Sequence, residues 1–200
     1  MSKNYQVEHY IQNQMKDYDS SLTRAFIRLF NIENQAKECQ GCVIDSVAIL
    51  IILKKNGIDA DLHLGEMCSD GKQDAYHCWL TVDDKIIDFG IYGNSNYNPY
   101  YKGKKFENPI IFEKIEDISD IVYYDGSTEI TNSWLSNLSE LSVLKYIKNC
   151  PYNRICRLIC KSLDIAEIMP NYEKIYKLAD GLFFPKLKKI DESPSGRRGI

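Results

Sequence analysis

One segment of the sequence is apolar on every face, and it constrains the fold more than any other. Helical spacing runs from Cys42 to Asn56-Gly57, a pair of residues that often ends a helix. The apolar residues of the segment are Val43, Ile44, Val47, Ala48, Leu50, Ile51, Ile52 and Leu53. They cover the whole circumference of a helix, so other elements have to enclose it. The sequence therefore predicts a domain built around one buried central helix.

Regions of helical and of strand periodicity are separated along the chain. Two helices are predicted within residues 1–36, before the central helix. After it the period changes to two. Strands are expected at 59–64, 76–82, 85–89, 109–112 and 121–124, and loops at 65–74 and 90–103. From residue 131 the pattern is helical again, with further helices expected at 153–163 and 171–178. Helices, then a sheet, then helices indicate an α+β fold.

The length and composition of the chain bound its domain organisation. It has 200 residues, of which 44% are hydrophobic and 26% charged, and these values exclude a disordered protein. Such a length fits one domain, or one domain with an elaboration. We expect residues 1–127 to form the main domain, residues 128–190 to be a helical elaboration packed on it, and residues 191–200 to be a disordered tail.

Charge and cysteine content bear on partners and on the cellular compartment. The net charge of −3 gives no reason to expect nucleic acid or an anionic membrane, because such partners usually require a basic excess. We find no secretory signal, and the longest apolar run is too short to span a bilayer. Seven cysteines, an odd number, argue against a complete disulfide framework. We therefore expect reduced thiols in a cytoplasm, or delivery into a host cytosol.

Three residues have the types and the placement that a nucleophilic cysteine site requires. Cys42 stands at the start of the central helix, where backbone dipoles and unpaired N–H groups favour a thiolate. His77 on one predicted strand can activate the thiol, and Asp88 on the next strand can orient the histidine. The oxyanion would be stabilised by the Cys42 backbone N–H and by a side-chain amide, for which Gln35 and Gln40 are candidates.

The hairpin that carries His77 and Asp88 has a predictable register. If Asp83 and Asp84 form a two-residue loop, Asp88 is the diagonal neighbour of His77 across the two strands. One face of the hairpin then carries His77, Trp79, Thr81, Ile86 and Asp88. The other face carries the apolar residues Cys78, Leu80, Val82, Ile87 and Phe89. The register that brings the histidine to the aspartate therefore also makes a clean core face.

These motifs resemble those of the transglutaminase-like superfamily. The resemblance rests on Gly41-Cys42 at a helix start, His77-Cys78-Trp79 on a strand, and Asp88 shortly after. Within this superfamily, the sequence is most similar to the compact branch that includes the leader peptidases of lasso-peptide biosynthesis. The resemblance implies a papain-like α+β core with an antiparallel sheet packed on a central helix, plus the C-terminal helices of this chain. It also implies a catalytic triad of Cys42, His77 and Asp88.

The reaction that this resemblance implies is acyl transfer from an amide through a thioester on Cys42. We expect a cysteine peptidase with a peptide or protein substrate, and neither cofactor nor metal. Two alternatives remain open: a glutamine deamidase or transglutaminase that acts on a protein, and an inactive peptide-binding module. Trp79 is expected to form a wall under the site. Tyr92 is a candidate for lining a substrate groove, with a solvated loop as its alternative. The oligomeric state is left open.

The same residues also have purely structural interpretations. A free cysteine such as Cys42 is often a small buried apolar residue. Cys39 and Cys42 also fit a Cys-x-x-Cys pair, as found in zinc and redox sites, but a second pair with normal zinc spacing is missing from the sequence. The histidines at positions 9 and 63 are expected to be exposed and to have no role in the site.

Overall fold

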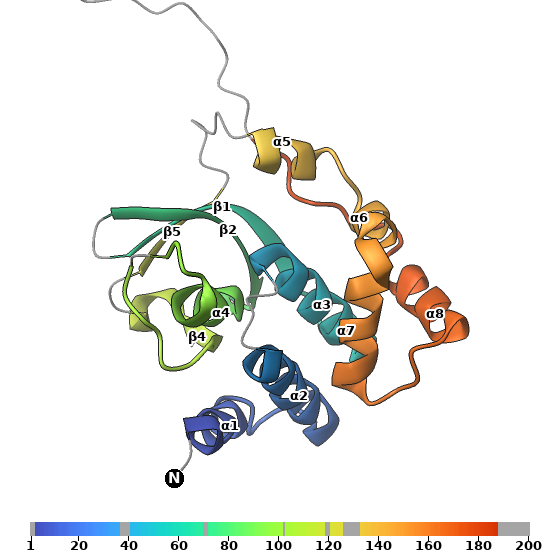
Figure 1. Ribbon diagram of the computed structural model, residues 1–200, viewed down its shortest axis with the longest axis horizontal. Coiled ribbons are helices and arrows are strands. Elements are labelled where there is room, and N and C mark those ends of the chain that lie inside the picture. The colour runs from blue at the N-terminus through green and yellow to red at the C-terminus, as the bar shows by residue number, and fades with distance from the viewer. Residues whose placement is uncertain are drawn as a thin grey trace, which may run out of the picture.

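A computed structural model of the chain describes residues 3–36, 41–69, 72–101, 103–118, 121–125 and 133–187. In this part of the chain, three α-helices are followed by a five-stranded sheet and then by four more α-helices, with a further helix inserted in the sheet region (Figure 1). The predicted order of elements and the α+β class are confirmed. None of the described helices combines the length and the hydropathy needed to cross a bilayer.

The central helix α3 (Cys42–Lys55) is enclosed as the sequence predicts. Every residue from Val47 to Leu53 is at most 4% exposed. The helix stops at Asn56, and Gly57 follows with a φ of 73°, a conformation that suits glycine. The helices α1 (Lys3–Gln14) and α2 (Ser20–Ala36) confirm the two that were predicted before it.

Five antiparallel strands form one sheet in the order β4-β3-β2-β1-β5. Their bounds are β1 (Asp61–Ser69), β2 (Lys72–Val82), β3 (Lys85–Asp88), β4 (Ile110–Lys114) and β5 (Ile121–Asp125). Helix α3 packs against β2 and β3. In Figure 1 the sheet lies on one side of α3 and helix α7 on the other. The expected antiparallel sheet packed on a central helix is therefore present.

The hairpin of β2 and β3 has the predicted register. Val82 pairs with Lys85, so Asp83 and Asp84 form a two-residue loop. Both loop residues take positive φ, 48° and 62°, as a type I′ turn requires. The residues that join the main core from this hairpin are Cys78, Leu80, Val82, Ile87 and Phe89. The opposite face carries His77 and Asp88 beside a smaller apolar cluster.

Two segments that were predicted as loops belong to regular elements. Residues 65–69 continue β1, because their backbone pairs with β2 on one side and with β5 on the other. These two ladders outweigh the polar composition of the segment. Residues 90–97 form helix α4 (Gly90–Tyr97), whose N-cap residue is Phe89. Asp88, one residue before it, caps the first turn by accepting a hydrogen bond from the backbone N–H of Ile91. The sequence prediction missed this cap and therefore placed a loop here.

Four α-helices follow the sheet: α5 (Ser133–Ser139), α6 (Val143–Asn149), α7 (Arg154–Leu163) and α8 (Met169–Ala179). Of these, α7 and α8 pack on α3, and α5 contacts β1. Of the two short 3-10 helices, η1 (Ile115–Asp117) lies between β4 and β5, and η2 (Pro151–Asn153) lies between α6 and α7. Helix α7 packs on α2 and α3 (Figure 1), and its buried residues belong to the same apolar core as those of α3. The domain boundary at residue 127 stays a prediction, and residues 191–200 lie outside the described part.

Candidate active site

Cys42 is the first residue of α3 and is packed directly against the start of α4. A Cβ atom built on Gly90 would lie 2.7 Å from both the Cα and the Cβ of Cys42. The same atom would lie 3.4 Å from Oδ1 of Asp88. A side chain at position 90 is therefore excluded unless a backbone moves, and glycine is required there by close approach. Immediately before Cys42, Gly41 has a φ of 101°, which again favours glycine.

His77 and Asp88 form a buried hydrogen-bonded pair. The Nε2 atom of His77 lies 2.6 Å from Oδ2 of Asp88, and neither side chain is exposed. The other carboxylate oxygen, Oδ1, accepts a hydrogen bond of 3.0 Å from the backbone N–H of Ile91. Asp88 therefore caps the first turn of α4 and holds the His77 ring at the same time.

The electrostatic environment of His77 is set by Asp88 and Cys42. Burial alone would lower the pKa of His77, but the charges of Asp88 and Cys42 and its interactions with both side chains raise this pKa to about 10. Asp88 engages Nε2, so Nδ1 is the ring atom left for the thiol. Nδ1 is buried and makes no hydrogen bond of ordinary length and geometry to any described residue. The interaction of His77 with Cys42 is therefore seen in its effect on the histidine pKa.

Aromatic rings enclose the histidine on the sheet side. Trp79 is 3% exposed and stacks parallel to His77, with ring centroids 6.3 Å apart and planes at 13°. His63 stacks on the same tryptophan at 5.4 Å, and its Nε2 lies 2.8 Å from Oγ1 of Thr81. The structure places Trp79 beside His77, and its role as a wall under the site stays a prediction. The structure corrects the expectation for His63, which is half-buried in this stack and not exposed.

Tyr123 is a site residue that the sequence prediction missed. Its hydroxyl donates a hydrogen bond of 2.8 Å to Oδ2 of Asp88, and its ring lies 4.9 Å from that of Trp79. Tyr123 is on β5, next to β1 and opposite Met67. The alternation of residues 121–124 marks a strand, but nothing in it identifies β1 as the pairing partner. The position of Tyr123 therefore depends on a sheet order that local pattern does not encode.

A second acidic residue is buried close enough to His77 and Asp88 to interact with their charges. Asp45, one turn after Cys42 in α3, is fully buried and interacts with Glu33 of α2, which is also fully buried. Burial raises the pKa of Asp45 to about 7, and the charge of Asp88 adds to this effect. Glu33 and the positive charges of Arg154 and His77 act in the opposite direction. The sequence offered only one signal for this residue, a single carboxyl group in an otherwise apolar helix.

The predicted oxyanion and groove residues are not confirmed by the described part of the structure. Gln35 is exposed in the last turn of α2, and no described hydrogen bond ties it to Cys42. Gln40 lies outside the described residues, as does Cys39. The expectation that Tyr92 lines a groove is corrected, because this side chain is 1% exposed and packs edge-on against Phe30 in the core. The cause is helix α4, which turns Tyr92 inward where a loop had been expected.

The alternative zinc and disulfide interpretations can be compared with the same geometry. In the described part of the chain, no group of three or more His, Cys, Asp or Glu side chains is arranged to hold a metal ion. Cys42, Cys78 and Cys150 are free thiols. Cys156 and Cys160 are buried in the core.

Comparison with protein-family models gives one match. Residues 12–102 match the model described as the transglutaminase-like superfamily. The matched region includes Cys42, His77 and Asp88 together with α2, α3 and the first three strands. Comparisons with curated proteins and with solved structures found no match. The branch that contains the lasso-peptide leader peptidases stays a prediction. Over residues 12–102, the chain is similar to the transglutaminase-like superfamily.

Proposed function

We propose that this chain is a cysteine peptidase that hydrolyses an amide bond of a peptide or protein through a thioester on Cys42. The observation that carries the proposal is the 2.6 Å hydrogen bond between His77 and Asp88, fully buried beside the first residue of α3. A cysteine at a helix start, a histidine that interacts with it and a carboxylate that fixes the histidine ring are the parts that this chemistry needs.

The proposed first step forms the thioester. The sulfur of Cys42 attacks the carbonyl carbon of the substrate amide, and His77 holds the proton that leaves the thiol. The C–N bond then breaks, the proton on Nδ1 of His77 passes to the leaving amine, and the acyl group stays on sulfur. The backbone N–H of Cys42 belongs to the first turn of α3, whose N–H groups lack acceptors within the helix. It can therefore donate to the oxyanion.

The second step returns the free enzyme. His77 removes a proton from a water molecule, and the water oxygen attacks the thioester carbonyl. The C–S bond then breaks to release a carboxylic acid, and the proton on His77 returns to the sulfur of Cys42. Throughout both steps Asp88 keeps the Nε2–H of His77 occupied, so that Nδ1 stays available to sulfur and substrate. An amine in place of water would give transamidation, and a glutamine side chain in place of the peptide bond would give deamidation.

One experiment separates these outcomes. The protein and its Cys42→Ala variant are incubated with a mixed peptide library and a fluorescent primary amine in water labelled with heavy oxygen, and products are identified by mass spectrometry. A peptidase leaves heavy oxygen at new C-termini, a deamidase leaves it in glutamate side chains, and a transglutaminase attaches the amine. All three signals should be absent with Cys42→Ala.

The reactivity of the thiol is measured in parallel. Iodoacetamide should label Cys42 well below pH 8, and much faster than the buried thiol of Cys78. If Cys42 labels no faster than Cys78 and no product forms, the chain is not an enzyme of this kind and the inactive peptide-binding alternative is favoured.

A further inference from the structure

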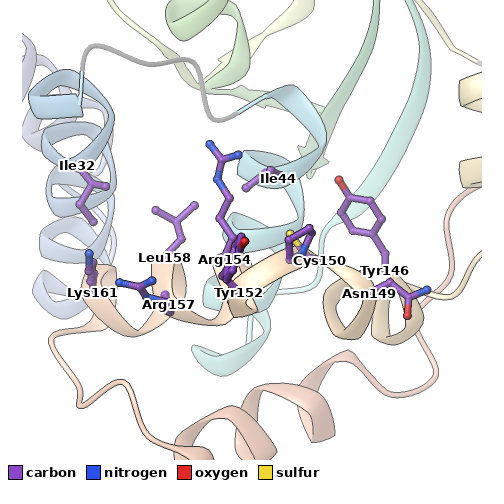
Figure 2. Close-up of a pocket in the computed structure, with 11 residues that line it drawn as sticks. Ile32, Ile44, Tyr146, Asn149, Cys150, Tyr152, Arg154, Arg157, Leu158 and Lys161 are labelled. Carbon is purple, nitrogen blue, oxygen red and sulfur yellow. The ribbon is translucent and has the colours of Figure 1, made fainter.

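A cavity of about 720 Å³ lies between α2, α3, α6 and α7 (Figure 2). Its volume is in the range of sites that hold a substrate or ligand. The apolar part of its wall comes from Ile32 of α2, Ile44 of α3 and Leu158 of α7. Tyr146 of α6 completes this wall. The cavity is thus bounded by the core of the transglutaminase-like region on one side and by the C-terminal helices on the other.

The charged side chains of the cavity all have the same sign. Arg154, Arg157 and Lys161 line it from α7, and no acidic residue is among the described residues that line it. This concentration occurs in a chain whose net charge is −3. Glu167, outside the lining, is 2.6 Å from Nε of Arg157 and 3.9 Å from Nζ of Lys161. Glu167 thus pairs with both basic residues and offsets part of their positive charge.

The third basic side chain points toward the catalytic part of the molecule. Figure 2 shows Arg154 extending from α7 toward the first turn of α3, next to Ile44. Its charge acts on Asp45, which is three residues after Cys42. A cleft lined by one sign of charge attracts the opposite sign, and the planar guanidinium suits a carboxylate.

The cavity also lies close to the candidate nucleophile. Ile44 is two residues after Cys42, so the cavity reaches α3 within one helical turn, about 5 Å of rise, of that residue. Tyr146, on another wall of the cavity, also indicates that the cavity lies near Cys42. Burial raises the pKa of this tyrosine, and the neighbouring thiols of Cys150, Cys78 and Cys42 raise it further. A ligand in the cavity would therefore lie beside the start of α3.

Backbone strain is concentrated at the edge of the cavity. Tyr152 and Asn153 both take left-handed conformations, with φ of 55° and 51°, although neither is glycine. Tyr152 lines the cavity and is 90% exposed. Strain of this kind persists where the surrounding structure enforces it, and it is frequent at binding sites. Here it presents an aromatic ring to solvent at the cavity edge.

We propose that this cavity binds an acidic segment of the peptide substrate, with a carboxylate toward Arg154 and an apolar side chain against Ile32 and Leu158. Its role as a substrate site rests on the proposed function, but its preference for an acidic peptide does not. The cavity therefore selects substrates in which a glutamate or aspartate lies close to the amide that Cys42 attacks.

Cys150 makes the preference measurable without catalysis. It lines the cavity, it is partly exposed and its thiol is free. In Cys42→Ala protein, the rate of Cys150 alkylation by iodoacetamide is followed by mass spectrometry with and without a glutamate-rich hexapeptide. The glutamine-containing counterpart of this peptide is the matched probe, because it differs only in charge. Binding of each fluorescein-labelled peptide is measured on the same protein by polarisation.

The acidic peptide should slow Cys150 alkylation severalfold and bind more tightly than the glutamine peptide. Arg154→Gln and Lys161→Gln should each weaken both effects, by about twofold or more per cation removed. Lys145→Gln, an exposed lysine of α6 outside the cavity, should leave them unchanged. Lys161 is at the surface, so Lys161→Gln is expected to fold. It therefore tests the role of the cations even if Arg154→Gln does not fold.

Two results separate this inference from the proposed function. If both peptides protect Cys150 equally, or if neither protects it, the cavity has no preference for acid and the inference is overturned even when Cys42 is active. If the acidic peptide protects Cys150 and the cation variants abolish this, the inference stands even when wild-type protein cleaves nothing, and only the proposed function fails.

Discussion

Tyr123 and His77 share one oxygen of Asp88: Oδ2 accepts from the tyrosine hydroxyl at 2.8 Å and from the histidine at 2.6 Å. Burial raises the pKa of Tyr123, so its hydroxyl keeps the proton and acts as a donor. With the backbone N–H of Ile91 on Oδ1, the carboxylate has donors from β2, β5 and α4. The orientation of the histidine is thus determined by elements that are distant in the sequence.

Loss of the Tyr123 hydroxyl should weaken the site without removing it. Tyr123→Phe is expected to reduce turnover by about tenfold or more, because a hydrogen bond to a charged group such as the Asp88 carboxylate is worth about 1.5–3 kcal/mol. Without that donor, Asp88 accepts more strongly from His77, so the alkaline limb of the pH–rate profile should move to higher pH. Tyr100→Phe is the control, since that side chain is 88% exposed. A turnover and an alkaline limb equal to those of wild type would show that the tyrosine only fills space.

Asp88→Asn should separate the orienting role of this residue from its capping role. The amide can still accept from the N–H of Ile91, so the thermal midpoint is expected to fall by only a few degrees. Turnover should fall by a factor on the order of 10⁴, because the amide favours the wrong tautomer of His77. A loss below about tenfold would mean that Asp88 is only a strand residue and helix cap.

For Gly90→Ala, helix propensity and close packing predict changes in stability of opposite sign. Helix propensity alone predicts that alanine stabilises the first turn of α4 by about 1 kcal/mol. The added Cβ would be 2.7 Å from two atoms of Cys42, and relieving such a contact costs about 1–3 kcal/mol. We expect a net loss of stability together with slower alkylation of Cys42. A variant that is more stable than wild type, with unchanged thiol reactivity, would contradict the close approach of α3 and α4.

The raised pKa of His77 predicts how stability depends on pH. Its folded pKa of about 10 lies above the ordinary value of 6.5, so the stabilisation is complete below pH 6.5 and is lost as pH rises through 10. The thermal midpoint of wild type should therefore fall between pH 7 and 10 more steeply than that of His77→Gln, which serves as the matched protein. Parallel curves for the two proteins would show that His77 is not charged in the folded state.

Asp45→Asn should stabilise the fold at alkaline pH. Burial raises the pKa of Asp45 from 3.8 to about 7, so the free energy of unfolding contributed by this group falls as pH rises from 4 through 7. The neutral amide removes this loss. Relative to wild type, the variant should be more stable by about 1–3 kcal/mol at pH 8 and nearly equal at pH 4, as measured by denaturant unfolding. A variant that is less stable at pH 8 would mean that the charged carboxylate is needed in the folded protein.

The part of the site that lies on one hairpin could be predicted from the sequence. The distance between His77 and Asp88 follows from a two-residue turn and strict alternation, which are local properties. The burial of the central helix was equally predictable, because a helix without a polar face has to be enclosed by other elements. Cys42 enters the site from a helix start, and its role as nucleophile stays a prediction.

What the sequence could not provide depends on contacts between distant elements. Tyr123 reaches Asp88 only because β5 pairs with β1, and β1 in turn with β2. Tyr92 turns inward because it belongs to a helix whose first turn is capped by Asp88. The sequence pattern places Asp88 in a strand and does not indicate that it would cap a helix. The cavity at Arg154 requires α7 to pack across α2 and α3, which periodicity does not reveal.

The double role of Asp88 links folding to readiness for chemistry. The first turn of α4 and the ring of His77 are attached to the two oxygens of the same carboxylate, and Gly90 brings that turn onto Cys42. A chain in which α4 has not yet formed has neither a fixed histidine nor a wall behind the thiol. Assembly of the site thus depends on α4, and a ligand that loosened α4 would inactivate the site without contacting the nucleophile.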